Sequence, residues 1–199
     1  MTAGMAPTST RRDHSPWLVW LLVAVALVAG WALKAYAENL TESYSAGGIT
    51  VRYPAGWVAS GGDDGVLRFR DARAGGVAPV LEVRSYPGPV GQDVTAALTV
   101  QADALALTRA RELSAYRTLD SDYAARWRGQ PALRVTYAFV RDLPNPGLTS
   151  PPTVVLGEDL MVLTRGRVVV FTLQAPEDLY PRLRGRLEAL TASASMGLP

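Results

Sequence analysis

The chain of 199 residues has no cysteine. This absence excludes disulfide bonds, thiolate nucleophiles, and zinc or iron–sulfur sites built on cysteine. It leaves the redox compartment open, because a cysteine-free domain folds in an oxidising or a reducing environment.

Histidine is almost as scarce, since His14 is the one histidine and it precedes a long apolar segment. The rest of the chain therefore cannot form a Ser-His-Asp triad, a histidine general base or a histidine metal site. No serine lies in a G-x-S-x-G or S-x-x-K motif, which leaves a serine hydrolase with little support. We therefore expect a protein that is not an enzyme and that holds no cofactor or metal ion.

The net charge is small, at +2, and it is unevenly placed. Setting aside Arg11, Arg12 and Lys34 from the 20 basic residues, and Asp13 from the 18 acidic ones, leaves 17 of each sign. A balanced domain gives no case for nucleic-acid binding.

The longest uncharged segment runs from Trp17 to Leu33. As a helix it would be roughly 26 Å long, and the residues up to Ala37 extend it to the roughly 30 Å hydrocarbon core of a bilayer. Tryptophan and tyrosine stand at both of its ends, as in the aromatic belts of spanning helices. The segment 17–37 is therefore predicted to be a transmembrane anchor that contacts the lipid bilayer through Trp17–Leu33.

The flanking charges predict the orientation of this anchor. Arg11 and Arg12 precede it and only Lys34 closely follows, so the positive-inside bias puts residues 1–16 in the cytoplasm as a disordered tail and the rest of the chain outside. A cleaved signal peptide is the alternative, because Ala35-Tyr36-Ala37 fits an A-x-A cleavage site and would release a secreted protein. The length of the apolar run favours the anchor, and both alternatives put the domain outside the cytoplasm.

After the anchor we expect a linker over residues 38–48 and one folded domain over 49–195. The pattern predicts several antiparallel strands, a helix over 93–113 that is free of proline and glycine, and a C-terminal helix that begins near Pro176 or Pro181. The expected strands cover residues 49–54, 66–71, 80–86, 116–127 and 133–139, followed by a hairpin of 159–164 and 168–174 around Arg165-Gly166. This order predicts an α+β fold, with an antiparallel β-sheet flanked by two helices.

Two short motifs in the domain are similar to those of a known family. The segment Tyr53-Pro54-Ala55-Gly56-Trp57 resembles the Y-P-x-x-W start of the PsbP-like superfamily, and Gly129-Gln130-Pro131-Ala132 resembles its G-x-P-A segment. The resemblance covers roughly residues 48–195 and implies the sandwich fold of that family, with binding and assembly roles and no catalytic residues. Tyr53-to-Trp57 and the 129–132 turn are fold markers, and we expect Trp57 and Trp127 to pack in the core.

Four arginines are the candidate partner-binding residues. Arg126 and Arg128 flank the turn at Gly129, and Arg165 and Arg167 flank the turn at Gly166, so each pair can present its charges to an acidic protein or to lipid headgroups.

The acidic residues give weaker candidates. Asp63 and Asp64 in a glycine-rich loop offer too few ligands for calcium, and an ordinary solvated turn is expected there. Glu158 and Asp159 are adjacent, so in a strand they face opposite ways and cannot act as a catalytic pair; we expect both on the surface.

The sequence therefore predicts a membrane-anchored, extracytoplasmic and non-catalytic binding module that contacts a protein partner. The alternative function is a small-ligand carrier or sensor with a cleft between the sheet and the helix 93–113. Val100 and Leu107, which lie off the main apolar face of that helix, motivate the cleft.

Overall fold

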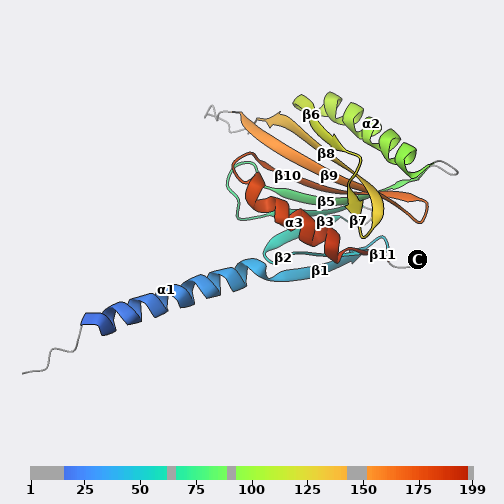
Figure 1. Ribbon diagram of the computed structural model, residues 1–199. Helices are drawn as coiled ribbons and strands as arrows, with labels where there is room; N and C mark the ends of the chain where they lie inside the picture. Colours follow the sequence, from blue (N-terminus) through green and yellow to red (C-terminus); the bar gives the residue numbers. More distant parts are fainter. Residues whose placement is uncertain (1–15, 62–65, 89–92, 143–151, 197–199) are drawn as a thin grey trace, which may run out of the picture. The chain divides into compact units, whose positions relative to one another are not determined.

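The computed structural model describes residues 16–61, 66–88, 93–142 and 152–196, and the chain divides into two units, Met1–Leu40 and Thr41–Pro199 (Figure 1). The expected tail over 1–16 lies outside the described residues except for Pro16, and so do Asp63 and Asp64.

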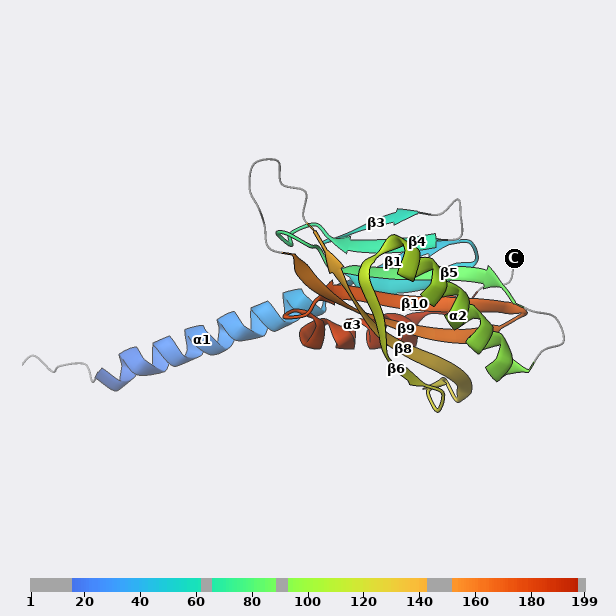
Figure 2. The same cartoon turned by 90° about the horizontal axis from the view of Figure 1, so that it is seen from above.

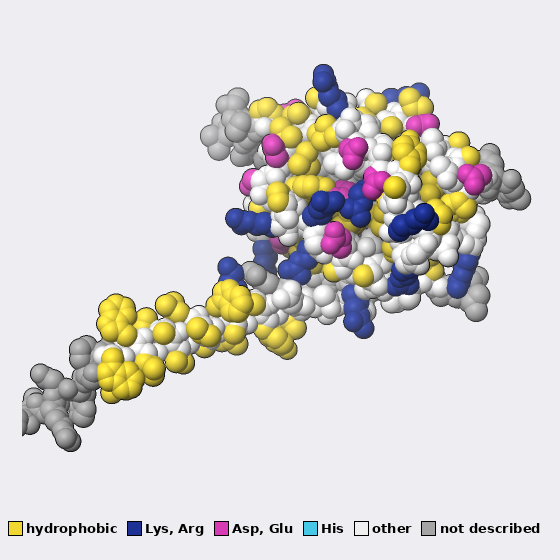
Figure 3. All heavy atoms as spheres, viewed as in Figure 1, with side chains coloured by type: hydrophobic (Ala, Val, Ile, Leu, Met, Phe, Trp, Pro, Cys, Tyr) yellow, Lys and Arg dark blue, Asp and Glu magenta, His cyan; other side chains and the backbone are white. Residues whose placement is uncertain are grey.

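The first unit consists of helix α1, Pro16–Asn39. Its segment Trp17–Ala37, 21 residues with a mean hydropathy of 2.2, is the one helix in the described part of the chain that is long and apolar enough to cross a membrane. None of this segment is buried within the unit. Figure 3 shows apolar side chains along most of the face of α1 in view.

The second unit is an α+β domain, which confirms the predicted fold class. A three-stranded sheet has the order β1-β2-β11, and an eight-stranded sheet has the order β3-β4-β5-β10-β9-β8-β6, with the short β7 paired to β8. All pairings are antiparallel. The strands are β1 Thr41–Ala46, β2 Ile49–Pro54, β3 Trp57–Gly61, β4 Val66–Asp71, β5 Val80–Pro87, β6 Ser114–Asp122, β7 Arg126–Trp127, β8 Gln130–Arg141, β9 Thr153–Thr164, β10 Arg167–Pro176 and β11 Ser195–Met196, and the helices are α2 Val94–Glu112 and α3 Tyr180–Ser193.

The large sheet separates two layers of the domain (Figure 2). Helix α2 packs mainly on β6, β8, β9 and β10 on one face, while α3 and the small sheet cover the other face. Strand β10 is buried on both sides, because Val168 and Val170 pack under α2 while Val169 and Phe171 pack toward α3. This burial on both faces accounts for the continuous apolar run in the sequence of β10.

Local chemistry explains both helix starts. The side chain of Asp93 caps α2 by accepting from the backbone N–H of Thr95, with N···O 3.0 Å. Helix α3 begins at Tyr180 with Pro181 in its first turn, where a missing N–H costs nothing. The helix predicted over 93–113 is confirmed, and the C-terminal helix begins close to Pro181, the later of its two expected starts.

The hairpin around Arg165-Gly166 is confirmed, and β9 and β10 extend beyond its predicted ends. The segment 38–48 differs from its prediction as a linker, because β1 occupies most of it and pairs with β2 along its whole length. The strand expected over 116–127 is interrupted after Asp122, and the chain resumes as the two-residue β7.

Strand β6 is one edge of the large sheet, and its pairing with β8 is irregular. The register shifts between Ser114 and Arg117 and again between Thr118 and Asp120. Strand β3, at the other edge, has only five residues.

Candidate functional site

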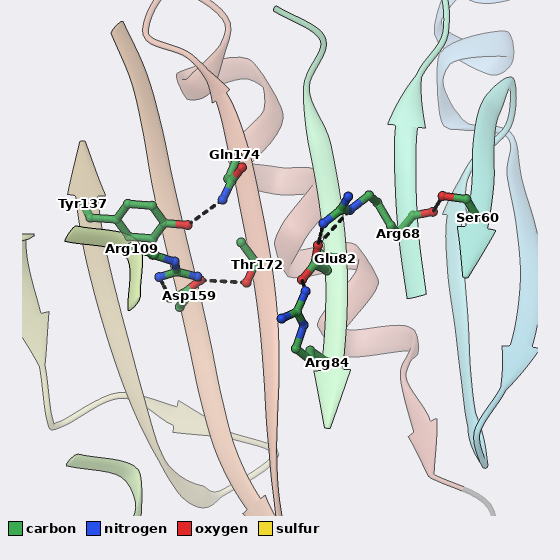
Figure 4. Close-up of polar contacts among 9 residues, drawn as sticks. All are labelled: Ser60, Arg68, Glu82, Arg84, Arg109, Tyr137, Asp159, Thr172 and Gln174. Atoms are coloured by element: carbon green, nitrogen blue, oxygen red, sulfur yellow. Dashed lines mark hydrogen bonds and ion pairs between the residues drawn. The ribbon is translucent and has the colours of Figure 1, made fainter. Parts of the chain in front are cut away.

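Five side chains from five neighbouring strands form a polar row across the face of the sheet that carries α2 (Figure 4). They are register partners from strand to strand, and they share one face because side chains alternate along each strand. The polar row consists of Ser60 in β3, Arg68 in β4, Glu82 in β5, Thr172 in β10 and Asp159 in β9. This line of polar groups marks the α2 face of the sheet as the candidate site.

The α2 end of the row is a buried ion pair. Arg109 of α2 makes a bidentate contact with Asp159, and its Nη2 donates to Oδ1 at 3.0 Å. The hydroxyl of Thr172 donates to the same Oδ1 at 2.7 Å. Burial lowers the pKa of Arg109, but the Asp159 carboxylate together with Tyr137 and Tyr116 outweighs burial and raises it, so the guanidinium stays charged. This pair fixes α2 to the middle of the sheet.

Tyr137 of β8 completes the buried cluster. The guanidinium of Arg109 lies over its ring, 4.2 Å from the ring centroid, and Gln174 Nε2 donates to its hydroxyl at 3.1 Å. Burial raises the pKa of Tyr137 well above its ordinary value. Gly157 lies directly opposite in β9, and only a residue without Cβ leaves room for this ring.

The other end of the row is open. Glu82 accepts from Arg68 Nε at 2.9 Å and Nη2 at 2.7 Å on one oxygen, and its other oxygen lies 2.9 Å from Arg84 Nη2. The side chains of Arg68 and Arg84 are 52% and 39% exposed, whereas that of Glu82 is 15% exposed. Two arginines therefore reach solvent around one largely covered carboxylate.

A groove of about 250 Å³ runs between these strands and α2. Its floor includes Glu82, Arg84 and Val170, and its wall includes Leu105 and Arg109 of α2. The residues expected to form such a cleft do not line it, since Val100 and Leu107 are 58% and 63% exposed. The groove lies where a cleft was predicted, between the sheet and the helix 93–113. The lining of the groove is largely polar, however, and not apolar as Val100 and Leu107 suggested.

Glu158 organises the opposite face. It lies 3.1 Å from Arg134 Nη1 and 3.3 Å from Arg184 Nε, and it accepts from the hydroxyl of Tyr180. Burial, together with this hydrogen bond to Glu158, raises the pKa of Tyr180. The prediction that Glu158 and Asp159 lie on the surface is wrong, because they are 1% and 0% exposed. That they face opposite ways is confirmed.

One signal in the sequence could have revealed these two carboxylates. They stand within the run Val154-Val155-Leu156-Gly157-Glu158-Asp159-Leu160-Met161-Val162-Leu163, where apolar residues continue on both sides. A strand that is apolar on both faces is buried on both, so charged residues in its middle require partners. The partners Arg109 and Arg184 come from helices 50 and 26 positions away, and no short-range pattern identifies them.

The four candidate arginines lie at turns on one end of the large sheet. Arg126, Arg128, Arg165 and Arg167 are all exposed. Arg128 Nη2 donates to the carbonyl of Ala192 at 2.7 Å, and its guanidinium stacks 4.8 Å from the ring centre of Trp127. Arg167 Nε donates to Ser85 Oγ at 2.7 Å. The register that pairs Ala132 with Val162 brings the two turns side by side.

The two tryptophans of the domain pack as expected. Trp57 and Trp127 both lie against the core on the α3 face, and Trp127 Nε1 donates to the carbonyl of Thr191 at 3.0 Å. Among the described residues, no three histidine, cysteine, aspartate or glutamate side chains converge on a point where a metal ion could bind.

No protein-family model matches the chain, and no curated protein matches it in sequence. The fold, however, is shared with solved structures. Cyanobacterial PsbP (CyanoP) from Synechocystis sp. PCC 6803 aligns with a TM-score of 0.55 at 18% identity, over 78% of this chain and 92% of that one. The Ran-binding protein Mog1p of Saccharomyces cerevisiae aligns with a TM-score of 0.50 at 12% identity, over 79% of this chain and 95% of that one. The chain therefore has the PsbP-like fold that its sequence motifs predicted.

Proposed function

We propose that this chain is a membrane-anchored, extracytoplasmic and non-catalytic binding module that contacts a protein partner. Helix α1 supplies the anchor through Trp17–Ala37, and the basic pair Arg11-Arg12 keeps the N-terminus in the cytoplasm. The fold is compatible with a binding role, since one protein that shares it is a Ran-binding protein.

The placement of the four turn arginines carries the proposal. Thr41, where the domain begins, pairs with Pro54 at the end of β2. A short turn connects β2 to Trp57, which begins β3 at one end of the large sheet. The turns at Gly129 and Gly166 lie at the opposite end, because β8 and β9 run the length of the sheet between them. Within the domain, the arginine turns and Thr41 therefore lie at opposite ends.

Two of these arginines are already held in place. The contacts of Arg128 with Ala192 and Trp127, and of Arg167 with Ser85, restrict their rotamers before any partner binds. An ordered guanidinium loses less side-chain entropy on binding than a free one, and it pairs bidentately with carboxylates. The partner surface that fits is therefore acidic.

A second function, as a carrier or sensor of a small ligand, is favoured by the groove beside α2. The two functions use different surfaces, since none of the four turn arginines lines the groove.

A pull-down from detergent-solubilised membranes tests the protein-partner function. Wild-type chain should recover a defined acidic partner after in-cell crosslinking, and a variant with Arg126, Arg128, Arg165 and Arg167 changed to glutamine should lose it. A matched variant with the exposed residues Arg52, Arg70, Arg73 and Arg117 changed to glutamine carries the same charge change and should keep it. Recovery of no specific partner, or equal loss in both variants, would count against the proposal.

The absence of cysteine makes the topology directly measurable. A membrane-impermeant maleimide applied to intact cells should label Ala96→Cys, which is exposed on α2, and should leave Thr8→Cys unlabelled. The intact mass of the purified protein separates the two alternatives for α1, because cleavage near Ala37 would remove the anchor. Labelling of Thr8→Cys alone would reverse the proposed orientation.

A further inference from the structure

The open corner of the groove has an excess of positive charge. Arg68 and Arg84 share the single carboxylate of Glu82. Elsewhere in the lining the charges are matched, because Arg109 is neutralised by Asp159, while Arg141 and Glu112 contribute one charge of each sign. The groove therefore carries one positive charge without a counter-charge among its lining residues and Asp159.

A hydrogen-bond donor in this corner is also unused. The Nε of Arg84 is buried and has no acceptor among the residues that the structure describes. Buried guanidinium nitrogens in folded proteins almost always have a partner, and an unpaired one is costly. A carboxylate is the group whose two oxygens match the donors of a guanidinium.

The rest of the groove sets the size and polarity of what can enter. Val80 and Val170 of the sheet and Leu105 of α2 place apolar surface next to the arginine corner. The volume of about 250 Å³ is below the range of about 300–1,000 Å³ of drug-sized ligand sites, so only a smaller molecule fits. The lining therefore places the charged Arg84 beside a short apolar surface formed by Val170 and Leu105.

We propose that this groove binds a small monocarboxylic acid, with its carboxylate on Arg84 and Arg68 and its apolar part against Leu105 and Val170. The inference rests on the small-ligand function above and names its ligand class. Glu82 and Glu112 in the lining repel a second negative charge, which disfavours phosphate and other dianions.

Titration of the full-length chain in detergent micelles, followed by NMR, tests this proposal. The probes are butyrate, its uncharged analogue butyramide, and inorganic phosphate. The Arg84 Nε–H signal is assigned by its loss in Arg84→Gln. Butyrate should shift this signal and the methyl signals of Leu105 and Val170 in one saturable process, and butyramide and phosphate should not.

The variants give the quantitative test. Arg84→Gln should weaken butyrate binding, followed at the methyl signals, by about tenfold or more, because a charge-assisted hydrogen bond is lost. Arg70→Gln removes an exposed arginine of the same face that lies outside the groove, and should change the affinity less than twofold. Thermal unfolding of each variant confirms that the fold is kept.

Four results would overturn the proposal. The Arg84 signal could stay fixed with butyrate, phosphate could bind as tightly as butyrate, or Arg70→Gln could lose as much affinity as Arg84→Gln. Equal methyl shifts with butyramide would reject the carboxylate while supporting a ligand groove, so this failure is distinct from failure of the small-ligand function. The protein-partner function is untouched by either outcome.

Discussion

Glu158 and Asp159 are neighbours in β9, and each binds the helix that covers its own face of the sheet. Asp159 pairs with Arg109 of α2, and Glu158 accepts from Tyr180 and pairs with Arg184, both in α3. The two helices contact opposite faces, so two consecutive residues determine where both lie. Because the partners are specific in geometry, this arrangement fixes the position of each helix along the strand more narrowly than apolar packing would.

Removing the charge of Asp159 should destabilise the domain strongly. Asp159→Asn leaves the largely buried guanidinium of Arg109 without its counter-charge, and such a change costs about 3–5 kcal/mol of unfolding free energy. Chemical denaturation of the full chain in micelles measures it, with Asp103→Asn, exposed in α2 and outside the groove, as the control. Replacing the pair together, Arg109→Met with Asp159→Leu, should restore most of the loss. A loss below about 1 kcal/mol in Asp159→Asn would show that the pair does not hold α2.

Two glycine-to-alanine exchanges should act in opposite directions. A Cβ on Gly157 would lie 2.1 Å from the ring of Tyr137, so Gly157→Ala should cost at least about 1–3 kcal/mol through displacement of the buried ring. Gly185 in α3 has no heavy atom within 4 Å of a built Cβ, and Gly185→Ala should stabilise by up to about 1 kcal/mol. Thermal unfolding of both variants measures these changes. A melting temperature of Gly157→Ala equal to that of wild type would mean that Tyr137 is free to move aside.

Backbone strain at Ala115 gives a third stability test. Ala115 has φ +53° at the junction of α2 and β6, a left-handed conformation that costs an L-residue about 1–2 kcal/mol. Ala115→Gly should therefore stabilise, by less than this amount because glycine also gains freedom in the unfolded chain. The same exchange at Ala104, exposed within α2, should destabilise by about 1 kcal/mol. If Ala115→Gly and Ala104→Gly both destabilised the domain, or both stabilised it, backbone strain at Ala115 would be ruled out.

Alkaline pH should weaken the domain through Tyr180. Burial, with the hydrogen bond to Glu158, raises the pKa of Tyr180 in the folded state, so the folded chain holds this proton more tightly than the unfolded chain. The resulting stability is complete below the unfolded pKa of about 10 and is lost as the pH rises above it. Between about pH 9 and 11, the free energy of unfolding should fall less steeply with pH in Tyr180→Phe than in wild type, as measured by chemical denaturation. Tyr123→Phe, exposed in the turn that follows β6, should keep the wild-type slope; equal slopes in all three would contradict the assignment.

The sequence predicted the elements whose determinants are local. The helix over 93–113 follows from a run without proline or glycine, and the hairpin follows from glycine at a turn where both Arg165 and Gly166 have positive φ. Such signals lie within a few residues of the structure that they determine.

Features that depend on distant pairing were missed. Strand β1, with the mostly polar sequence Thr41–Ala46, is extended because β2 supplies its hydrogen bonds, and the alternation of Tyr44 and Ala46 with Ser45 is too short to predict a strand by itself. The burial of Glu158 and Asp159 depends on arginines that the fold brings from α2, α3 and β8. The nearness of the two arginine turns needs the β8–β9 register, which the sequence does not specify by itself.

The shifted register of β6 has a consequence for chains crowded in the plane of a bilayer. Membrane attachment would confine neighbouring copies to two dimensions, where exposed sheet edges meet often. A regular edge strand would recruit a second chain and extend into a fibre, but the bulges in β6 and the charges of Arg117, Asp120 and Asp122 break the row of backbone groups that such growth requires. The irregular edge thus protects the protein against polymerising with itself.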